Sequence, residues 1–278
     1  MNMIWHFQKI CVMRCFSLYL LVSLVPVCIP APFADHFEGP HPAPGAVSAA
    51  FHAMENGDSS LTARLHFNVM PNEGDSRKEP VRIACVGNSI THGGMGRDAW
   101  PQQLGSMLGE EFDVRNFGVG GCTLLKKGDF PYWNEPALSG ATGFDPHIVI
   151  ILLGTNDSKP RNWIHGDAFF DDYMDLVGLF RRGDRNPVIF TAYPPPVFRM
   201  LAGINHTIIR DEMIPVIDSV RTAAATRLID FFNPMLGESR FFPDGVHPSA
   251  EGYALMARIA AGAVLEVMPG TAKEKENH

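Results

Sequence analysis

The chain has 278 residues, of which 46% are hydrophobic and 19% are charged, and its formal net charge at pH 7 is -7. This length and apolar content are ample for one well-packed domain and poor for two large ones. The acidic balance, with a sequence pI near 5.9, argues against nucleic acid as the main partner. A neutral or weakly charged ligand fits better.

Residues 1–34 have the layout of an export signal. Lys9 and Arg14 supply positive charge before an apolar core over 16–29, and small residues suited to cleavage follow. The core falls short of the roughly 18 residues that span a bilayer, so we expect no stable membrane span. The protein is therefore predicted to be secreted or periplasmic, and Cys28 leaves lipid attachment open as an alternative.

The remainder divides into three parts. Residues 35–80 are punctuated by Pro and Gly and predict a tether or small extension with one hairpin or edge strand near 61–69. Residues 81–268 predict the folded domain. A charged tail over 269–278 is expected to be flexible.

Strand and helix patterns alternate through the folded domain. Short apolar, β-branched runs predict five strands over 81–86, 113–118, 147–153, 187–192 and 227–231. Helical spacing predicts four helices near 100–108, 169–180, 205–225 and 250–267, the third kinked or restarted near Pro215 because proline cannot donate the backbone bond. No clear helix is expected between residues 118 and 143. This order predicts an α/β fold, a three-layer α/β/α sandwich around a five-stranded parallel sheet, flavodoxin-like in outline.

The loops after parallel strands share one rim of such a sheet, where ligands bind. After the first strand, Ser89 stands between Gly87 and Gly93, so that backbone can approach a small ligand closely. An ordinary β-to-α turn also favours these residue types. Ser89 is thus a candidate nucleophile that needs support from the other loops.

Two further rim loops offer hydrogen-bond donors. The second strand leads into Gly118-Val119-Gly120-Gly121, which fails as a dinucleotide motif because Thr123 replaces the third glycine, yet exposes backbone N–H groups. The third strand leads into Gly154-Thr155-Asn156-Asp157, where the Asn156 amide can donate into the cleft. A helix cap or Asx-turn remains the alternative role for Asn156.

The loop after the fifth strand contains Asp244 and His247. At this spacing a carboxylate can accept from imidazole Nδ1–H and leave Nε2 free to accept a proton. An ordinary solvent-exposed turn would explain an isolated Asp and His at this spacing nearly as well. The stronger argument is that a serine, oxyanion donors and an oriented histidine are all expected on one rim.

Four blocks in this order resemble the SGNH hydrolases of the GDSL type: Val86-Gly87-Asn88-Ser89, Asn116 to Gly121, Gly154 to Asp157 and Asp244 to His247. The resemblance implies Ser89 as nucleophile, His247 as base held by Asp244, and Gly121 and Asn156 as oxyanion donors beside the Ser89 N–H. The chain departs from the family at two positions. Asn88 stands where Asp is more common, and Gly120 stands where Ser is frequent.

The resemblance also favours the carbohydrate-deacetylating branch, with an acetylated oligo- or polysaccharide as substrate. Among the rim-loop aromatic residues, Tyr132, Trp133 and Trp163 are the expected substrate contacts. No cofactor or metal is expected, because the histidines show no ligand spacing. A lipid-directed esterase or lysophospholipase, an O-acetyltransferase using the same residues and a non-catalytic glycan-binding protein remain alternatives.

The cysteines add one further alternative. Three of the five lie in the predicted leader, and Cys85 and Cys122 remain, which is too few for a disulfide framework. Cys85 lies in a predicted buried strand and is expected to act as a small core residue. Cys122 follows Gly121 directly, so a thiol nucleophile is the alternative to Ser89.

Overall fold

The computed structural model describes residues 79–94, 98–183 and 185–268. The predicted leader, the tail and all of the extension except Glu79 and Pro80 lie outside the described residues.

Five parallel strands form one sheet in the order β2-β1-β3-β4-β5. The strands are β1 (Val81–Gly87), β2 (Phe112–Gly118), β3 (Ile148–Leu152), β4 (Val188–Tyr193) and β5 (Arg227–Asp230). In the register, Gly87 at the end of β1 pairs with Gly118 on one side and Leu152 on the other. The predicted five-stranded parallel sheet is confirmed, and its carboxyl-terminal rim gathers the loops that carry the candidate residues.

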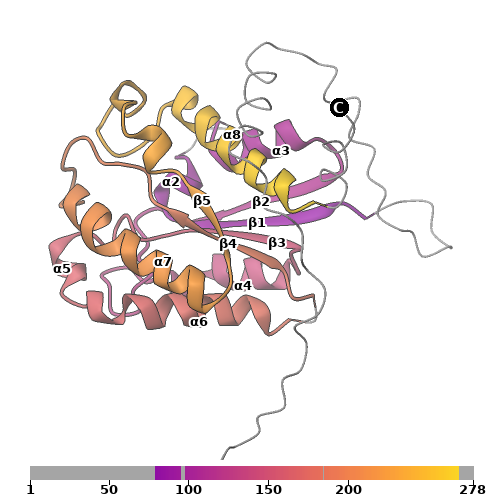
Figure 1. The fold of residues 1–278 in the computed structure, drawn as a ribbon, viewed down its shortest axis with the longest axis horizontal. Coiled ribbons are helices and arrows are strands. Elements are labelled where there is room, and N and C mark those ends of the chain that lie inside the picture. Colours follow the sequence, from indigo (N-terminus) through magenta and orange to yellow (C-terminus); the bar gives the residue numbers. More distant parts are fainter. Residues whose placement is uncertain (1–78, 95–97, 184, 269–278) are drawn as a thin grey trace, which may run out of the picture. The chain divides into compact units, whose positions relative to one another are not determined.

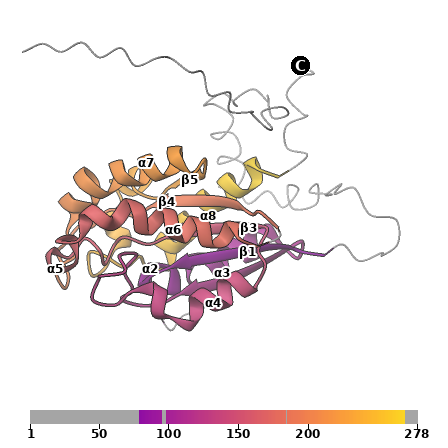
Figure 2. The same ribbon diagram turned by 90° about the horizontal axis from the view of Figure 1, so that it is seen from below.

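Helices cover both faces of this sheet, as Figures 1 and 2 show. One face carries α3 (Trp100–Leu108) and α8 (Ala250–Glu266), and the other carries α4 (Pro136–Gly143), α6 (Phe169–Arg181) and α7 (Ile214–Ala223). The short helices α2 (Ser89–His92) and α5 (Pro160–Trp163) lie in the rim loops. Within the described ranges, none of these helices has the length and apolarity that crossing a membrane requires.

The central strand β3 is buried along its whole length, which explains its unbroken apolar sequence. Alternate side chains enter the two core layers: Ile148, Ile150 and Leu152 face α3 and α8, whereas Val149 and Ile151 face the other layer. Full burial of each such side chain stabilises the fold by roughly 1.5–3 kcal/mol. The strand therefore holds the two helical layers together.

Helix α4 corrects the expectation of a helix-free segment between residues 118 and 143. Pro136 occupies its first position, where a missing N–H is tolerated, and Leu138 and Ala141 are buried. Gly140, which lowers helix propensity, packs closely on the neighbouring strand, because a Cβ atom there would lie 3.3 Å from Cε1 of Phe117. Tertiary packing thus outweighs the weak local propensity.

The predicted helix over 205–225 is interrupted, as expected. A π-helical segment at Ile208–Met213 (η3) precedes α7, and Pro215 is the second residue of α7. The wider turn accommodates the proline ring and its missing N–H group.

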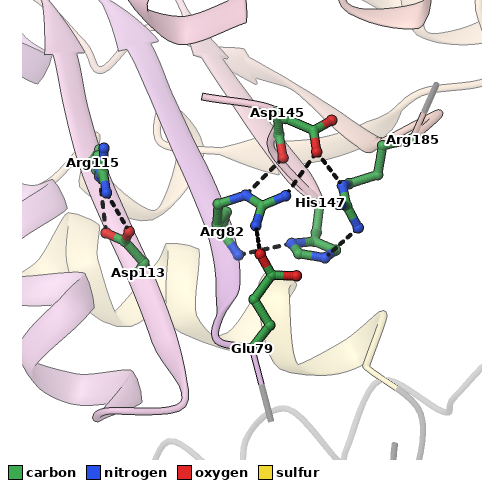
Figure 3. Close-up of polar contacts among 7 residues, drawn as sticks. All are labelled: Glu79, Arg82, Asp113, Arg115, Asp145, His147 and Arg185. Carbon is green, nitrogen blue, oxygen red and sulfur yellow. Dashed lines mark hydrogen bonds and ion pairs between the residues drawn. The ribbon is translucent and has the colours of Figure 1, made fainter. Parts of the chain in front are cut away.

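An ion-pair network joins the amino-terminal ends of β1, β3 and β4, opposite the rim (Figure 3). Asp145 accepts from Arg82 Nη2 at 2.8 Å and from Arg185 Nε at 2.9 Å, and Arg82 also pairs with Glu79. His147 Nδ1 accepts the backbone N–H of Arg82 at 2.9 Å, and Arg185 Nη1 lies 2.9 Å from His147 Nε2. The network ties three strands together at the edge remote from the candidate site.

Candidate active site

Ser89 is the first residue of α2, directly after β1. The Asn88 side chain caps this helix, since its Oδ1 accepts the Ile90 N–H at 3.0 Å. Gly87 permits the tight turn, because a Cβ atom there would meet the Thr91 side chain and lie 2.7 Å from the Leu152 carbonyl oxygen. Asn88, where the family more often has Asp, therefore preserves the cap.

Asp244 and His247 form a compact turn after β5. One carboxylate oxygen of Asp244 accepts the backbone N–H groups of Val246 and His247 at 2.8 and 2.7 Å, and the other lies 2.6 Å from His247 Nδ1. Partial burial alone would raise the pKa of Asp244, but these backbone and imidazole donors hold it below its ordinary value. The carboxylate is thus ionised at neutral pH and orients the ring.

His247 Nε2 lies 2.9 Å from Ser89 Oγ. The structure therefore places Ser89, His247 and Asp244 in one hydrogen-bonded series, although the serine and the histidine are 158 positions apart. In this geometry Nδ1–H donates to the carboxylate and Nε2 can accept the serine proton.

Hydrogen-bond donors flank this series. Gly121 lies in the loop after β2 with φ 86°, and a Cβ atom on the preceding Gly120 would lie 4.0 Å from the Ser89 Cβ. Asn156, only 4% exposed, uses one amide N–H to bond the Cys122 carbonyl oxygen at 3.1 Å, which leaves the second N–H for a ligand. The Ser89 N–H, at the first helical position, has no intrahelical acceptor.

The loop after β4 packs against the Asp244 turn. The backbone N–H of Phe198 donates to the Gly245 carbonyl oxygen at 2.8 Å, and Arg199 Nε donates to the Asp244 carbonyl oxygen at 3.2 Å. Gly245 has φ 87°, and a Cβ atom there would lie 2.8 Å from the Arg199 backbone nitrogen. A larger residue would therefore displace the turn that holds His247.

The structure corrects one of the predicted substrate contacts. Tyr132 is 1% exposed and its hydroxyl donates to the Phe117 carbonyl oxygen at 2.6 Å, so it packs in the core. Trp133 and Trp163 are half-buried, and their indole N–H groups donate to the Leu124 carbonyl oxygen and to Glu212, respectively. Both keep part of their rings at the surface.

Phe130 is a fourth aromatic residue of the predicted rim loops, beside the three expected substrate contacts. Its side chain is 41% exposed, and its Cδ1 lies 3.5 Å from where a Cβ atom on Gly121 would stand. Its carbonyl oxygen accepts the Thr123 N–H at 2.9 Å, which fixes the backbone beneath the ring. An aromatic residue in a glycine-rich rim loop was the available signal, but sequence alone cannot separate exposed from buried rings.

The alternative thiol nucleophile is not supported by the geometry. Cys122 is fully buried, and its burial, followed by the charges of Glu135 and Asp157, raises the pKa of the thiol to about 12. The thiol is therefore protonated at neutral pH and remote from solvent. Within the part of the chain that the structure describes, no three His, Cys, Asp or Glu side chains gather as a metal site would require.

Comparison with known proteins agrees with this arrangement. The model of the GDSL-like Lipase/Acylhydrolase family matches residues 85–255. An acetylxylan esterase from Xylanibacter ruminicola is 38% identical over 211 residues, which are 68% of this chain and 44% of that protein. The chain thus spans less than half the length of this curated relative.

Solved structures share the fold. The carbohydrate acetylesterase Est24 from Sinorhizobium meliloti is 17% identical with a TM-score of 0.53, covering 67% of this chain and 99% of that one. The acetyl xylan esterase AlAXEase is 17% identical with a TM-score of 0.54, covering 66% and 100%. Since the family model spans more than half of the chain, from β1 into α8, the chain belongs to the GDSL-like lipase/acylhydrolase family.

Proposed function

We propose that this protein is a serine esterase that removes acetyl groups from a carbohydrate, with an acetylated xylan as the first substrate to test. The observation that carries the proposal is the series of Ser89, His247 and Asp244, with contacts of 2.9 and 2.6 Å. A hydroxyl so placed beside an oriented imidazole is an activated nucleophile. The complete series also argues against a glycan-binding protein without catalytic activity.

The proposed reaction has two halves. In the first, His247 Nε2 takes the Ser89 proton while Oγ bonds to the ester carbonyl carbon, and the imidazolium then protonates the departing sugar hydroxyl as the ester bond breaks. In the second, His247 takes a proton from water as the water oxygen bonds to the acetyl carbon, and the imidazolium then returns a proton to Ser89 Oγ as the bond between Oγ and the acetyl carbon breaks and acetate leaves. Asp244 holds the ring and stabilises its positive charge in both halves.

Negative charge develops on the carbonyl oxygen in each half. The Ser89 and Gly121 N–H groups and the second N–H of Asn156 are the proposed donors to that oxygen. Donors already held in place by the surrounding loops stabilise the transition state without further reorganisation.

The substrate class is supported by the relative from Xylanibacter ruminicola, an acetylxylan esterase. The exposed ring of Phe130 beside Gly121 is consistent with a sugar ring as part of the substrate, because aromatic faces pack on the apolar faces of sugars. Trp133 and Trp163 remain proposed contacts further along the same loops.

The test is acetate release from acetylated xylan and from triacetin by the full chain, with Ser89→Ala as the control. We expect acetate from both with the wild type and none above background with the variant. A series of 4-nitrophenyl esters should show rates that fall as the acyl chain lengthens.

Acetate release that survives Ser89→Ala would overturn the proposed nucleophile. Preference for long acyl chains would instead favour a lipid-directed esterase. Transfer of acetyl to an added sugar in preference to water would identify an O-acetyltransferase built on the same residues.

A further inference from the structure

Asp157 is a buried carboxylate next to Asn156 that the proposed reaction does not use. It is 0% exposed, and its two oxygens accept backbone N–H groups: Oδ2 from Leu124 at 3.0 Å and Oδ1 from Leu125 at 2.7 Å. Burial raises the pKa of Asp157 to about 6, even though both N–H groups oppose the shift. These two donors, together with the backbone N–H of Asp157 itself, stabilise the charged form of the carboxylate.

Both donors belong to the loop that carries Gly121. Between β2 and η1 (Tyr132–Asn134) this loop contains no helix or extended strand, and Thr123 bonds the backbone of Phe130 and Tyr132 through an isolated bridge. Side chains from other segments add to this backbone pairing. Asn156 donates to the Cys122 carbonyl oxygen, and Asp157 accepts the N–H groups of Leu124 and Leu125, two and three residues further along the chain. Two consecutive residues after β3 thus form hydrogen bonds with the segment directly following Gly121.

The far end of the same loop is anchored separately. Asn162 Oδ1 accepts the Asp129 N–H at 2.9 Å, while Asn162 Nδ2 donates to Asp129 Oδ1 and to the Asn156 carbonyl oxygen, each at 2.9 Å. This anchor fixes the backbone of Asn156 relative to the end of the loop. Asp157, together with the Asn156 amide, therefore holds the beginning of the loop.

We propose that Asp157 is a positioning residue, which holds the Gly121 N–H at the distance from the Asn156 amide that the oxyanion requires. This inference rests on the proposed esterase function. A carboxylate suits the task because it offers one acceptor to each of two neighbouring N–H groups. An asparagine in its place would turn an amide N–H toward one of these donors, and that bond would be lost.

The matched control is Asp172 in α6. Asp172 is 7% exposed, and its Oδ2 accepts the N–H of Lys126, the next residue of the same loop, at 2.8 Å. Asp172→Asn removes the charge of a second buried carboxylate that holds the same loop, together with its ion pair to Lys126 Nζ at 3.4 Å, without touching Leu124 or Leu125. The two variants therefore separate a general loss of loop stability from a loss of oxyanion geometry.

The experiment compares Asp157→Asn and Asp172→Asn in the full chain, with 4-nitrophenyl acetate as substrate and phenylboronic acid as a probe that bonds Ser89 as a tetrahedral adduct. We expect Asp157→Asn to lower kcat by about 10- to 100-fold and to change KM by less than about threefold. The affinity of the enzyme for phenylboronic acid should fall by a factor similar to that of kcat. Asp172→Asn should change kcat, KM and the affinity for phenylboronic acid by less than about threefold each.

A kcat and a boronic acid affinity for Asp157→Asn that match those of Asp172→Asn would overturn the inference while leaving the esterase proposal intact. A wild type that neither cleaves the ester nor binds the boronic acid would overturn both.

A measurement on the wild type keeps the inference testable if Asp157→Asn does not fold. Because coupling between two contacts is reciprocal, the boronic acid adduct should slow amide hydrogen exchange at Leu124 and Leu125. The adduct should leave exchange at Lys126 unchanged. Unaltered exchange at Leu124 and Leu125 would overturn the inference.

Discussion

The side-chain amide of Asn156 has two N–H groups, one with a structural role and one with a proposed catalytic role. One N–H bonds the Cys122 carbonyl oxygen at 3.1 Å, and the geometry leaves the other for the oxyanion. We predict that Asn156→Ala lowers kcat on 4-nitrophenyl acetate by about 10²- to 10³-fold, because one of three donors is removed. Steady-state kinetics with the wild type alongside measure this loss.

Asn156→Asp provides the comparison. It retains the shape of the side chain but replaces the donor with a negative oxygen, so its loss should be at least as large. A kcat within threefold of the wild type for either variant would exclude Asn156 as an oxyanion donor.

Phe130 presents an exposed ring beside Gly121. We predict that Phe130→Ala lowers kcat/KM for acetylated xylo-oligosaccharides by roughly two- to tenfold, with the roughly 0.5–1.5 kcal/mol of an aromatic pair as the scale for ring contact. Triacetin, which has no sugar ring, should be cleaved almost as well as by the wild type. Acetate release from each substrate in separate assays, with the variant beside the wild type, measures the change.

Two variants test the interpretation of Phe130. Phe130→Trp should retain the preference for the sugar ester, because it keeps an aromatic face. Val188 is 38% exposed at the amino-terminal end of β4, remote from the candidate site, so Val188→Ala should leave kcat/KM for both substrates unchanged. Equal losses on both substrates with Phe130→Ala would point to the reaction centre instead.

At the scale of single residues, motif spacing was sufficient to bring the serine, the histidine and their partners onto one rim. It failed for Tyr132, because an aromatic residue in an irregular loop has no periodicity that reports its burial. Asp157 was readable as part of a motif, but its two backbone partners lie about thirty positions earlier and become visible only in the folded loop.

Among the elements, the strands were predicted within one residue at each end. The runs of β1, β3 and β4 are largely apolar and buried, so composition alone marks them, whereas β2 and β5 have mixed and only partly buried sequences. Helix α4 was missed because Gly140 lowers its local propensity. The close packing of Gly140 on Phe117 is a tertiary contact that no local pattern displays.

The network at the amino-terminal edge makes the junction of β1, β3 and β4 sensitive to acid. Burial, followed by the charges of Arg185 and Arg82, lowers the pKa of His147, although Glu79 and Asp145 oppose the shift. As the pH falls, His147 is therefore protonated at a higher pH in the unfolded chain than in the folded chain. Stability from His147 is therefore present in full above its ordinary pKa of about 6.5 and is lost as pH falls through the lower folded value.

We predict that the free energy of unfolding of the wild type falls more between pH 7.5 and pH 5 than that of His147→Gln. Urea unfolding at several pH values measures the difference. His92→Gln, at an exposed histidine of α2, is the control and should follow the wild type. Identical pH dependence in His147→Gln and the wild type would show that His147 does not couple to folding.

At the scale of the whole molecule, the candidate site depends on the assembly of separate segments. Ser89, Gly121, Asn156 and His247 follow β1, β2, β3 and β5, and none of these loops contains the reacting groups by itself. The sheet order brings these loops together at one rim, as the parallel-sheet prediction implied, whereas the roles predicted for their residues came from the family resemblance. The substrate could not be predicted in the same way, because it depends on side chains that cover the rim.

Export is a proposal for the whole chain, since residues 1–34 lie outside the described residues. We predict that the full chain, expressed in a bacterial host, reaches the periplasm or medium and loses its leader near Ala31 or Ala34. Cell fractionation with mass spectrometry of the amino terminus tests this. An intact Met1 in the cytoplasm would contradict it, and a lipid-bearing Cys28 would indicate anchoring.

The long separation between nucleophile and base has a consequence for biosynthesis. Ser89 leaves the ribosome 158 residues before His247, and the turn that orients the imidazole is followed by α8, which packs on α3 just beyond the nucleophile. A growing chain therefore carries its serine without a partner for most of translation. The proposed hydrolytic activity should therefore appear only late in synthesis, once the turn that carries His247 has formed and α8 has packed on α3, so that a chain ending before His247 should not cleave esters.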